Sequence, residues 1–284
     1  MVILIVYTLL RWIDHLSKLG RVGETIDRVE QAAIDAINNR VQWPHLGAAA
    51  YPCESVIPSS ALIITSLHTG YVQHIDVQAL GVIANTDEIQ IFMDVLPGSF
   101  VHIGMPLART VSLSKARGEE LASSNEKIIA TLAIGVRRTF EHDPRFGLSV
   151  LSEIASRALS PAVNDPGTAI DVIGRGVRSL TCWGTPKEPA AKIDADCQHV
   201  YLRGLTVDDL FDDFFAPIAR DGAGLVEVDL RMMKALVSLA QINPAMFRGA
   251  CTRHAELLLK HANTALVLEE DRHKLRAAAR PLLH

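Results

Sequence analysis

The segment spanning residues 60–111 constrains the fold more than any other part of this chain, because its apolar residues come in the short runs typical of β-strands. β-Branched residues are frequent in these runs, and glycine-containing turns such as Pro97-Gly98 separate them. The stretch Val77–Ala84 predicts a short helix between two of the strands. We therefore predict a small β module over this segment.

Part of the module resembles half of a biotinyl or lipoyl barrel. From Pro97 to Leu107, a Pro-Gly turn leads a strand into a second glycine turn. Such carriers need a modifiable lysine at a hairpin tip, and residues 60–111 contain no lysine, so we expect no cofactor. The histidines of the module lack helical spacing and a nearby acidic or cysteine cluster, which favours surface or hydrogen-bonded side chains over metal ligands for His68, His74 and His102.

Helical periodicity flanks the β module on both sides. Apolar residues recur every three or four positions from Val22 to Val41, which predicts an amphipathic helix that ends at Trp43-Pro44. Beyond the module, similar stripes predict a mainly helical remainder, including Val226–Ile242 and a last helix from Phe247 to Leu268. Since 49% of residues are apolar and 21% charged, a disordered chain is excluded, and we predict an α+β fold.

Two of the carboxyl-terminal segments carry polar residues that could indicate a site. The segment from Leu205 to Phe215 places four aspartates beside apolar residues, which favours an amphipathic helix with an acidic outer face over a cation site. His254 and His261 share the apolar stripe of the last helix. They lie two turns apart, too far for one metal ion unless other segments contribute ligands, and packing against a partner or in an oligomer is an open alternative.

The amino terminus raises the question of a membrane. Residues Met1–Leu10 are uncharged, but a bilayer core of about 30 Å needs roughly 20 helical residues. The run is thus an interfacial anchor, the end of a spanning helix or a buried core helix. Because Arg11, Trp12 and Lys18 follow it, we expect a partial transmembrane helix that leaves the membrane on the cytoplasmic side.

These features divide the chain into five expected segments. They are a partial membrane helix (1–16), an amphipathic helix and connector (17–59), the β module (60–111), a helical signature region (112–183) and a carboxyl-terminal helical region (184–284). The formal net charge is −4, and no basic surplus indicates nucleic acid. The expected partners are the membrane and a membrane protein or a second copy of the chain.

The segment from Arg137 to Arg178 holds the most informative polar residues. Asp165 precedes Pro166, the arrangement of a capping carboxylate before the first residue of a helix. Three interpretations stay open: an internal network of paired charges, an anion site built from arginines, and a divalent-cation site that uses Glu141, Asp143, Asp165 and Asp171. The candidate ligand-binding residues are Arg137, Arg138, Asp143, Arg157, Asn164, Asp165, Thr168, Asp171 and Arg175.

Several motifs together resemble one bacterial family. The ALSP-x-x-NDP-x-TA pattern at residues 158–169, with Arg138-Thr139, Asp143-Pro144 and the PGSFVHIGMPLA stretch, is similar to the predicted membrane proteins grouped as domain of unknown function 2254. The resemblance covers roughly residues 13–275. It implies several amino-terminal transmembrane helices followed by a cytoplasmic domain, with no established activity and no assigned catalytic residue. Against that pattern, this sequence is expected to start within the last span.

Two functional hypotheses follow. The first is a membrane-associated protein whose cytoplasmic, non-enzymatic domain serves interaction or gating. The second is a sensor or enzyme that binds a small anion or a divalent cation through the Arg/Asp cluster of residues 137–175. The sequence contains no Walker loop, G-x-S-x-G, H-E-x-x-H or dinucleotide fingerprint, which favours the non-enzymatic hypothesis.

Overall fold

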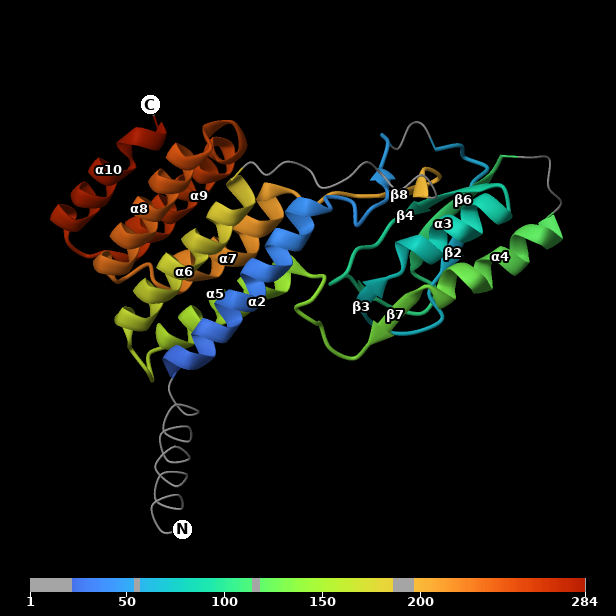
Figure 1. Ribbon diagram of the computed structural model, residues 1–284. Coiled ribbons are helices and arrows are strands. Elements are labelled where there is room, and N and C mark those ends of the chain that lie inside the picture. The colour runs from blue at the N-terminus through green and yellow to red at the C-terminus, as the bar shows by residue number, and fades with distance from the viewer. Residues whose placement is uncertain (1–21, 54–56, 114–117, 186–196, 284) are drawn as a thin grey trace, which may run out of the picture. The chain divides into compact units, whose positions relative to one another are not determined.

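The computed structural model describes residues 22–53, 57–113, 118–185 and 197–283, and its fold is α+β as expected (Figure 1). The chain divides into two compact units, each described here by itself. Within the described residues, the helical unit comprises 22–34, 147–181 and 211–283. The β unit comprises 35–146 and 182–210 with the gaps just given.

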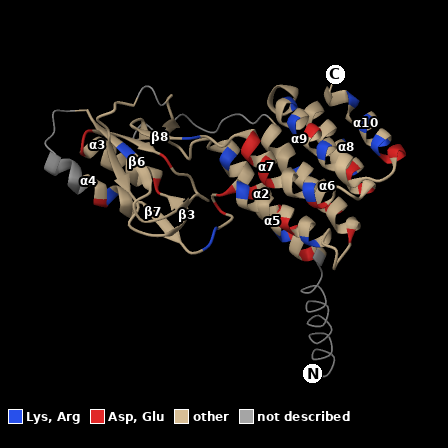
Figure 2. Ribbon diagram, turned by 180° about the vertical axis from the view of Figure 1, so that it is seen from behind, with Lys and Arg blue, Asp and Glu red and all other residues tan. Residues whose placement is uncertain are grey.

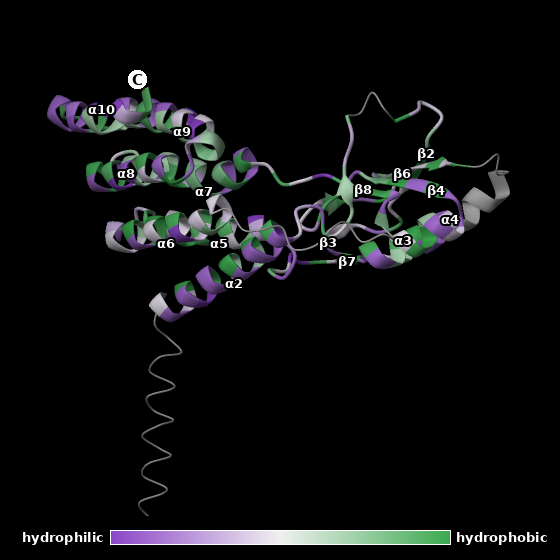
Figure 3. Ribbon diagram, turned by 45° about the horizontal axis from the view of Figure 1, so that its top comes forward, coloured by the Kyte–Doolittle hydropathy of each residue, from purple (hydrophilic) through white to green (hydrophobic). Residues whose placement is uncertain are grey.

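The helical unit is built from amphipathic helices whose apolar sides form its core. Figure 3 shows hydrophobic and hydrophilic residues on each of these helices. Four phenylalanines, at positions 211, 214, 215 and 247, have no exposed surface and centre this core. The helices are α2 (Val22–Gln42), α5 (Pro144–Ala158), α6 (Pro166–Gly184), α7 (Val207–Asp221), α8 (Val226–Ile242), α9 (Pro244–Ala265) and α10 (Glu269–Leu283), of which α2, α5, α6 and α7 have ends in the β unit.

The structure confirms most of the helices predicted from periodicity, but the predicted end of the last helix, Leu268, is wrong. Helix α9 stops at Ala265, because Leu266 adopts an extended conformation, and Leu268 is exposed instead of sharing the apolar stripe. A separate helix, α10, then begins at Glu269. Acidic residues fill its first turn, where they stabilise the positive end of the helix dipole.

The β unit contains two sheets and two helices. The five-stranded sheet has the order β1-β8-β4-β6-β2, and the three-stranded sheet has the order β5-β3-β7. The strands are β1 (Ala49–Ala50), β2 (Leu62–Thr65), β3 (Gly70–Ile75), β4 (Ile89–Met93), β5 (Phe100–Val101), β6 (Pro106–Ser112), β7 (Leu132–Gly135) and β8 (Val200–Leu202). The helices are α3 (Val77–Thr86), which confirms the predicted short helix, and α4 (Gly118–Ala130).

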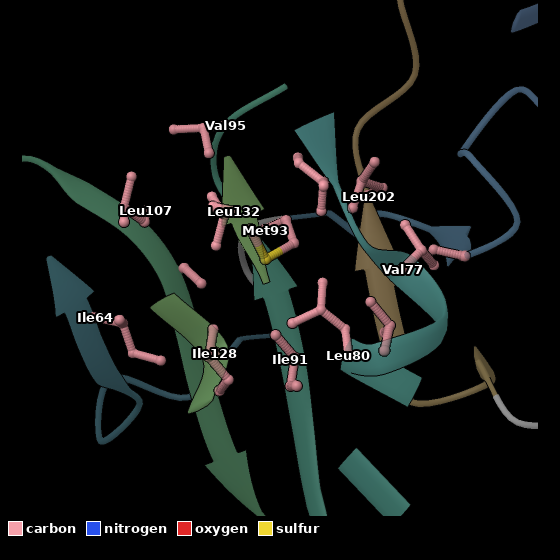
Figure 4. Packing of buried hydrophobic residues seen from close by; sticks show 14 of the residues in the cluster. Ile64, Val77, Leu80, Ile91, Met93, Val95, Leu107, Ile128, Leu132 and Leu202 are labelled. Carbon is pink, nitrogen blue, oxygen red and sulfur yellow. The ribbon is translucent and has the colours of Figure 1, made fainter. Parts of the chain in front are cut away.

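One face of the five-stranded sheet packs in the core of the β unit. Alternate residues of β4, Ile91 and Met93, lie beside Val200 and Leu202 of β8 and point into this core (Figure 4). Leu80 of α3 lies in the same cluster and has no exposed surface. Side chains on this face alternate along β4, as the pleat of a strand requires. Phe92 lies between Ile91 and Met93 and is also buried, with its ring stacked on that of Tyr201 at 4.7 Å.

Three strands lie outside the segment in which we predicted the β module. Strands β1, β7 and β8 are two to four residues long and pair with partners far away in the sequence, so local patterns give little signal for them. The likeness to half of a biotinyl or lipoyl barrel is not seen in the strand pairing. Strand β5 pairs with β3, whereas β6 lies in the other sheet between β4 and β2.

The predicted partial membrane helix, residues 1–16, lies outside the described residues. Among the helices that the structure does describe, none combines the length and the apolar character needed to cross a bilayer.

Candidate functional site

The β unit buries an arginine whose hydrogen-bonding capacity is mostly unused. Arg40 lies in the last turn of α2 and is only 2% exposed. Its Nη2 donates to the carbonyl oxygen of His142 at 3.0 Å, while Nε and Nη1 have no acceptor. Burial lowers the pKa of Arg40 to about 10, although the nearby Asp143 acts in the opposite direction. The side chain therefore stays charged at neutral pH in a place that disfavours charge.

Asp143 neutralises a second arginine in the same place. Arg138 donates to both carboxylate oxygens, from Nε at 2.7 Å and from Nη2 at 3.0 Å. The backbone N–H of Phe146 donates to Oδ1 at 3.2 Å, so the carboxylate also caps the start of α5. Arg138 thus holds Asp143 in a bidentate pair, and Arg40 donates no hydrogen bond to this carboxylate.

The Pro97-Gly98 turn approaches Asp143 so closely that position 98 must be a glycine. Gly98 has a φ of +95°, and a Cβ added there would lie 2.2 Å from Oδ2 of Asp143. A side chain at this position would displace the carboxylate and strain the backbone. The turn of the PGSF stretch therefore packs directly against the paired carboxylate.

Two histidines connect this cluster to an open groove. The rings of His142 and His74 lie 4.7 Å apart, and burial together with the neighbouring His74 lowers the pKa of His142. His74 also lines a groove of about 730 Å³, beside polar side chains of Asp76, Lys127 and Thr131. We refer to Arg40, Arg138, His142 and Asp143 as the Arg40 cluster.

The structure separates the candidate residues that we predicted from the sequence. Only Arg138 and Asp143 form a pair within the β unit, where Arg137 offers its carbonyl oxygen to Gln73 Nε2 at 2.7 Å. The other six lie in the helical unit: Arg157, Asn164, Asp165, Thr168, Asp171 and Arg175.

In the helical unit, the predicted cap at Asp165 is confirmed. Its carboxylate accepts from the backbone N–H of Thr168 at 3.1 Å and from the Thr168 hydroxyl at 2.6 Å. These hydrogen bonds lower the pKa of Asp165. Asn164 takes a φ of +48°, which turns the chain into α6 at Pro166. The NDP motif is therefore a helix start.

Two further arginines of the helical unit pair with carboxylates. Figure 2 shows basic and acidic residues on the helices of this unit. Arg175 is paired with Asp171 at 2.7 Å and with Glu30 at 2.8 Å, and it also contacts Asp27. Arg178 donates to the same Glu30 at 2.6 Å. Arg157, by contrast, is exposed on α5. This arrangement matches the internal network of paired charges that we considered from the sequence.

The four carboxylates considered for a divalent cation are divided between the units. Glu141 and Asp143 belong to the β unit, whereas Asp165 and Asp171 belong to the helical unit. Within the part of the chain that the structure describes, no three His, Cys, Asp or Glu side chains are grouped as metal ligands would be.

Sequence reasoning missed Arg40, although a signal was present. Buried positions of α2 recur at Ala33, Ile37 and then Arg40, which places the arginine on the apolar side of the helix. A charged residue in line with an apolar stripe indicates a buried charge that needs a partner.

Comparisons with known proteins place the chain in a family. A family model described as a predicted membrane protein, DUF2254, matches residues 1–238. Uncharacterised proteins of Mycobacterium bovis and Mycobacterium tuberculosis are 28% identical over 167 residues, which is 58% of this chain and 32% of each relative. The match thus spans about a third of the length of these curated relatives. No solved structure matches the chain. Because the family model covers most of the sequence, as its motifs indicated, the chain belongs to the DUF2254 family of predicted membrane proteins.

Proposed function

We propose that this chain is the cytoplasmic, non-enzymatic part of a bacterial inner-membrane protein, and that it senses a small oxyanion through Arg40. Binding of the anion would control a contact with a membrane protein partner or a second copy of the chain, as an interaction or gating module does. The observation that carries this proposal is the buried guanidinium of Arg40, whose Nε and Nη1 have no acceptor.

The energetics of an unpaired buried charge support an anionic ligand. Nε and Nη1 carry three of the five N–H donors of an arginine. Each buried donor left without an acceptor costs roughly 1–3 kcal/mol, and more when the group is charged. An oxyanion supplies both the missing acceptors and the opposite charge, so its binding relieves several of these penalties at once.

The surrounding residues favour a small anion over a cation. Asp143 is already held by Arg138 in a bidentate pair, so its charge is compensated and it repels an incoming anion weakly. The buried position of Arg40 restricts a ligand to a few atoms, such as phosphate, sulfate or a short carboxylate. Arg138 and Asp143, two of the residues predicted from the sequence, serve as the frame of this site.

Family membership and the amino-terminal sequence support the membrane part of the proposal. The family is described as one of predicted membrane proteins, and residues 1–10 form an uncharged apolar run. Basic residues that follow the run favour a cytoplasmic location for the remainder.

A thermal-shift experiment on the full chain in detergent tests the anion site. We expect phosphate, sulfate or malonate to raise the melting temperature of the wild type and of Arg157→Met, which replaces an exposed arginine of α5. Arg40→Met keeps an unbranched apolar stem but removes the donors and the charge, so it should lose this response. An equal response of all three proteins to each anion, or none in the wild type, would contradict the proposal.

A further inference from the structure

Two turns of the β unit expose large apolar side chains at adjacent positions. Leu67 lies between β2 and β3 and is 59% exposed, and Ile103 lies between β5 and β6 and is 68% exposed. Ser66 N donates to the carbonyl oxygen of Met105, and Gly104 N donates to that of Ser66, both at 2.9 Å. These hydrogen bonds hold the two turns together. We call residues 66–69 and 102–105 the apolar tip.

The sequence around the apolar tip contains no formal charge. Residues 57–75 and 95–108 include no Asp, Glu, Lys or Arg. Five of the fourteen large apolar residues that are exposed in the described chain lie in these two stretches: Leu62, Ile63, Leu67, Phe100 and Ile103. In Figure 2, strand β3 within the first stretch has no charged residue along its ribbon. Because it carries no charge, a surface of this kind costs little free energy to desolvate.

Several backbone groups of the apolar tip are hydrogen-bonded within it. The Ser66 hydroxyl donates to the carbonyl oxygen of His68 at 2.7 Å, and His68 N donates back to that hydroxyl at 3.2 Å. Met105 N donates to the carbonyl oxygen of His102 at 3.0 Å. Unpaired backbone groups are the main barrier to placing a turn in an apolar medium, and internal hydrogen bonds lower this barrier.

We infer that the apolar tip contacts the lipid surface, with the side chains of Leu67 and Ile103 entering the interfacial region. A lipid surface is the favoured occupant for two reasons. The chain belongs to a family of predicted membrane proteins. The exposed side chains of Leu67 and Ile103 are aliphatic, and the stretches around them include no Asp, Glu, Lys or Arg to form the charged rim usual at a protein interface. This inference is independent of the anion site.

Site-specific fluorescence on the full chain tests this inference. The exposed Cys53 and the half-buried Cys182 are replaced by serine, and a single cysteine is introduced by Ile103→Cys or by Leu67→Cys. Val136→Cys is the matched control, because Val136 is 87% exposed at the end of β7 in the same unit. Each protein is labelled with an environment-sensitive fluorophore and reconstituted into phosphatidylethanolamine and phosphatidylglycerol vesicles.

We expect the fluorescence emission of the labels at positions 103 and 67 to shift to shorter wavelength on reconstitution. Spin-labelled lipids should quench these two labels at least twofold more than they quench the label at position 136. Each labelled protein must keep the melting temperature of its unlabelled parent, which the exposure of these side chains favours. Equal access of aqueous iodide to all three labels would overturn the inference. Shielding from iodide without quenching by lipid would also overturn it, because it would indicate a protein partner.

Discussion

Asp229 offers a quantitative test of the packing of the helical unit. It lies on α8, is 1% exposed, and neither of its carboxylate oxygens has a hydrogen-bond partner. Burial, with a smaller effect from Glu227, raises the pKa of Asp229 from 3.8 to about 7. The folded unit therefore holds a proton that the unfolded chain releases at mildly acidic pH.

The direction of the pH dependence follows from this difference. Between pH 3.8 and about 7 the folded state binds one more proton than the unfolded state, so the free energy of unfolding falls as the pH rises. The free energy of unfolding falls by about 1.4 kcal/mol per pH unit in this range. The fall is complete just above pH 7, where it amounts to about 4 kcal/mol. Asp229→Asn is neutral at every pH and removes this dependence.

Urea denaturation of the wild type and Asp229→Asn at pH 5 and pH 8 measures the effect. We expect the stability of the variant relative to the wild type to increase by about 3 kcal/mol between the two pH values. Glu256→Gln removes an exposed carboxylate from the same unit and serves as the control. If the free energies of unfolding of Asp229→Asn and the wild type differ by the same amount at both pH values, the conclusion that Asp229 is buried and unpaired is wrong.

Two further predictions concern the β unit and the thiols. In urea denaturation, Gly98→Ala should destabilise the protein by about 1–3 kcal/mol more than Gly104→Ala does. Both glycines have a positive φ, but only a Cβ at position 98 would contact Asp143. An equal decrease in the free energy of unfolding in the two variants would contradict that contact. In thiol labelling, the exposed Cys53 should react within the native state, whereas Cys251, whose thiol pKa burial raises to about 12, should react only after unfolding. Rapid native labelling of Cys251 would contradict its buried position.

Local patterns predicted the elements whose residues carry their own signal. Helix α2 ends just before Trp43-Pro44, as predicted, and α8 ends at Ile242, the predicted last residue. Each helix stops before an X-Pro pair, because a proline restricts the residue before it. The cap at Asp165 was predictable for a similar reason, since a carboxylate followed by Pro166 favours the first turn of a helix. These features depend on neighbours within four residues.

Features that depend on distant residues were not predictable in the same way. Strand β8 is three residues long and exists because β1 and β4 flank it in the sheet. The candidate arginines and carboxylates of residues 137–175 share a sequence segment, but they are divided between two units. Arg138 pairs with Asp143 in one unit and Arg175 with Asp171 in the other. Arg40 lies 102 residues before His142, to which it donates, and only the fold reveals that these residues are close together.

The stability of Arg40→Met in a buffer without phosphate or sulfate tests the central claim most directly. If Nε and Nη1 of Arg40 lack acceptors in the protein without bound anion, replacing Arg40 by an unbranched apolar side chain should leave the free energy of unfolding unchanged or raise it by about 1–4 kcal/mol. Added phosphate should then stabilise the wild type but not Arg40→Met, which reduces the difference between their free energies of unfolding. A loss of about 3–5 kcal/mol in Arg40→Met, the result of breaking a buried ion pair that is already complete, would contradict the account.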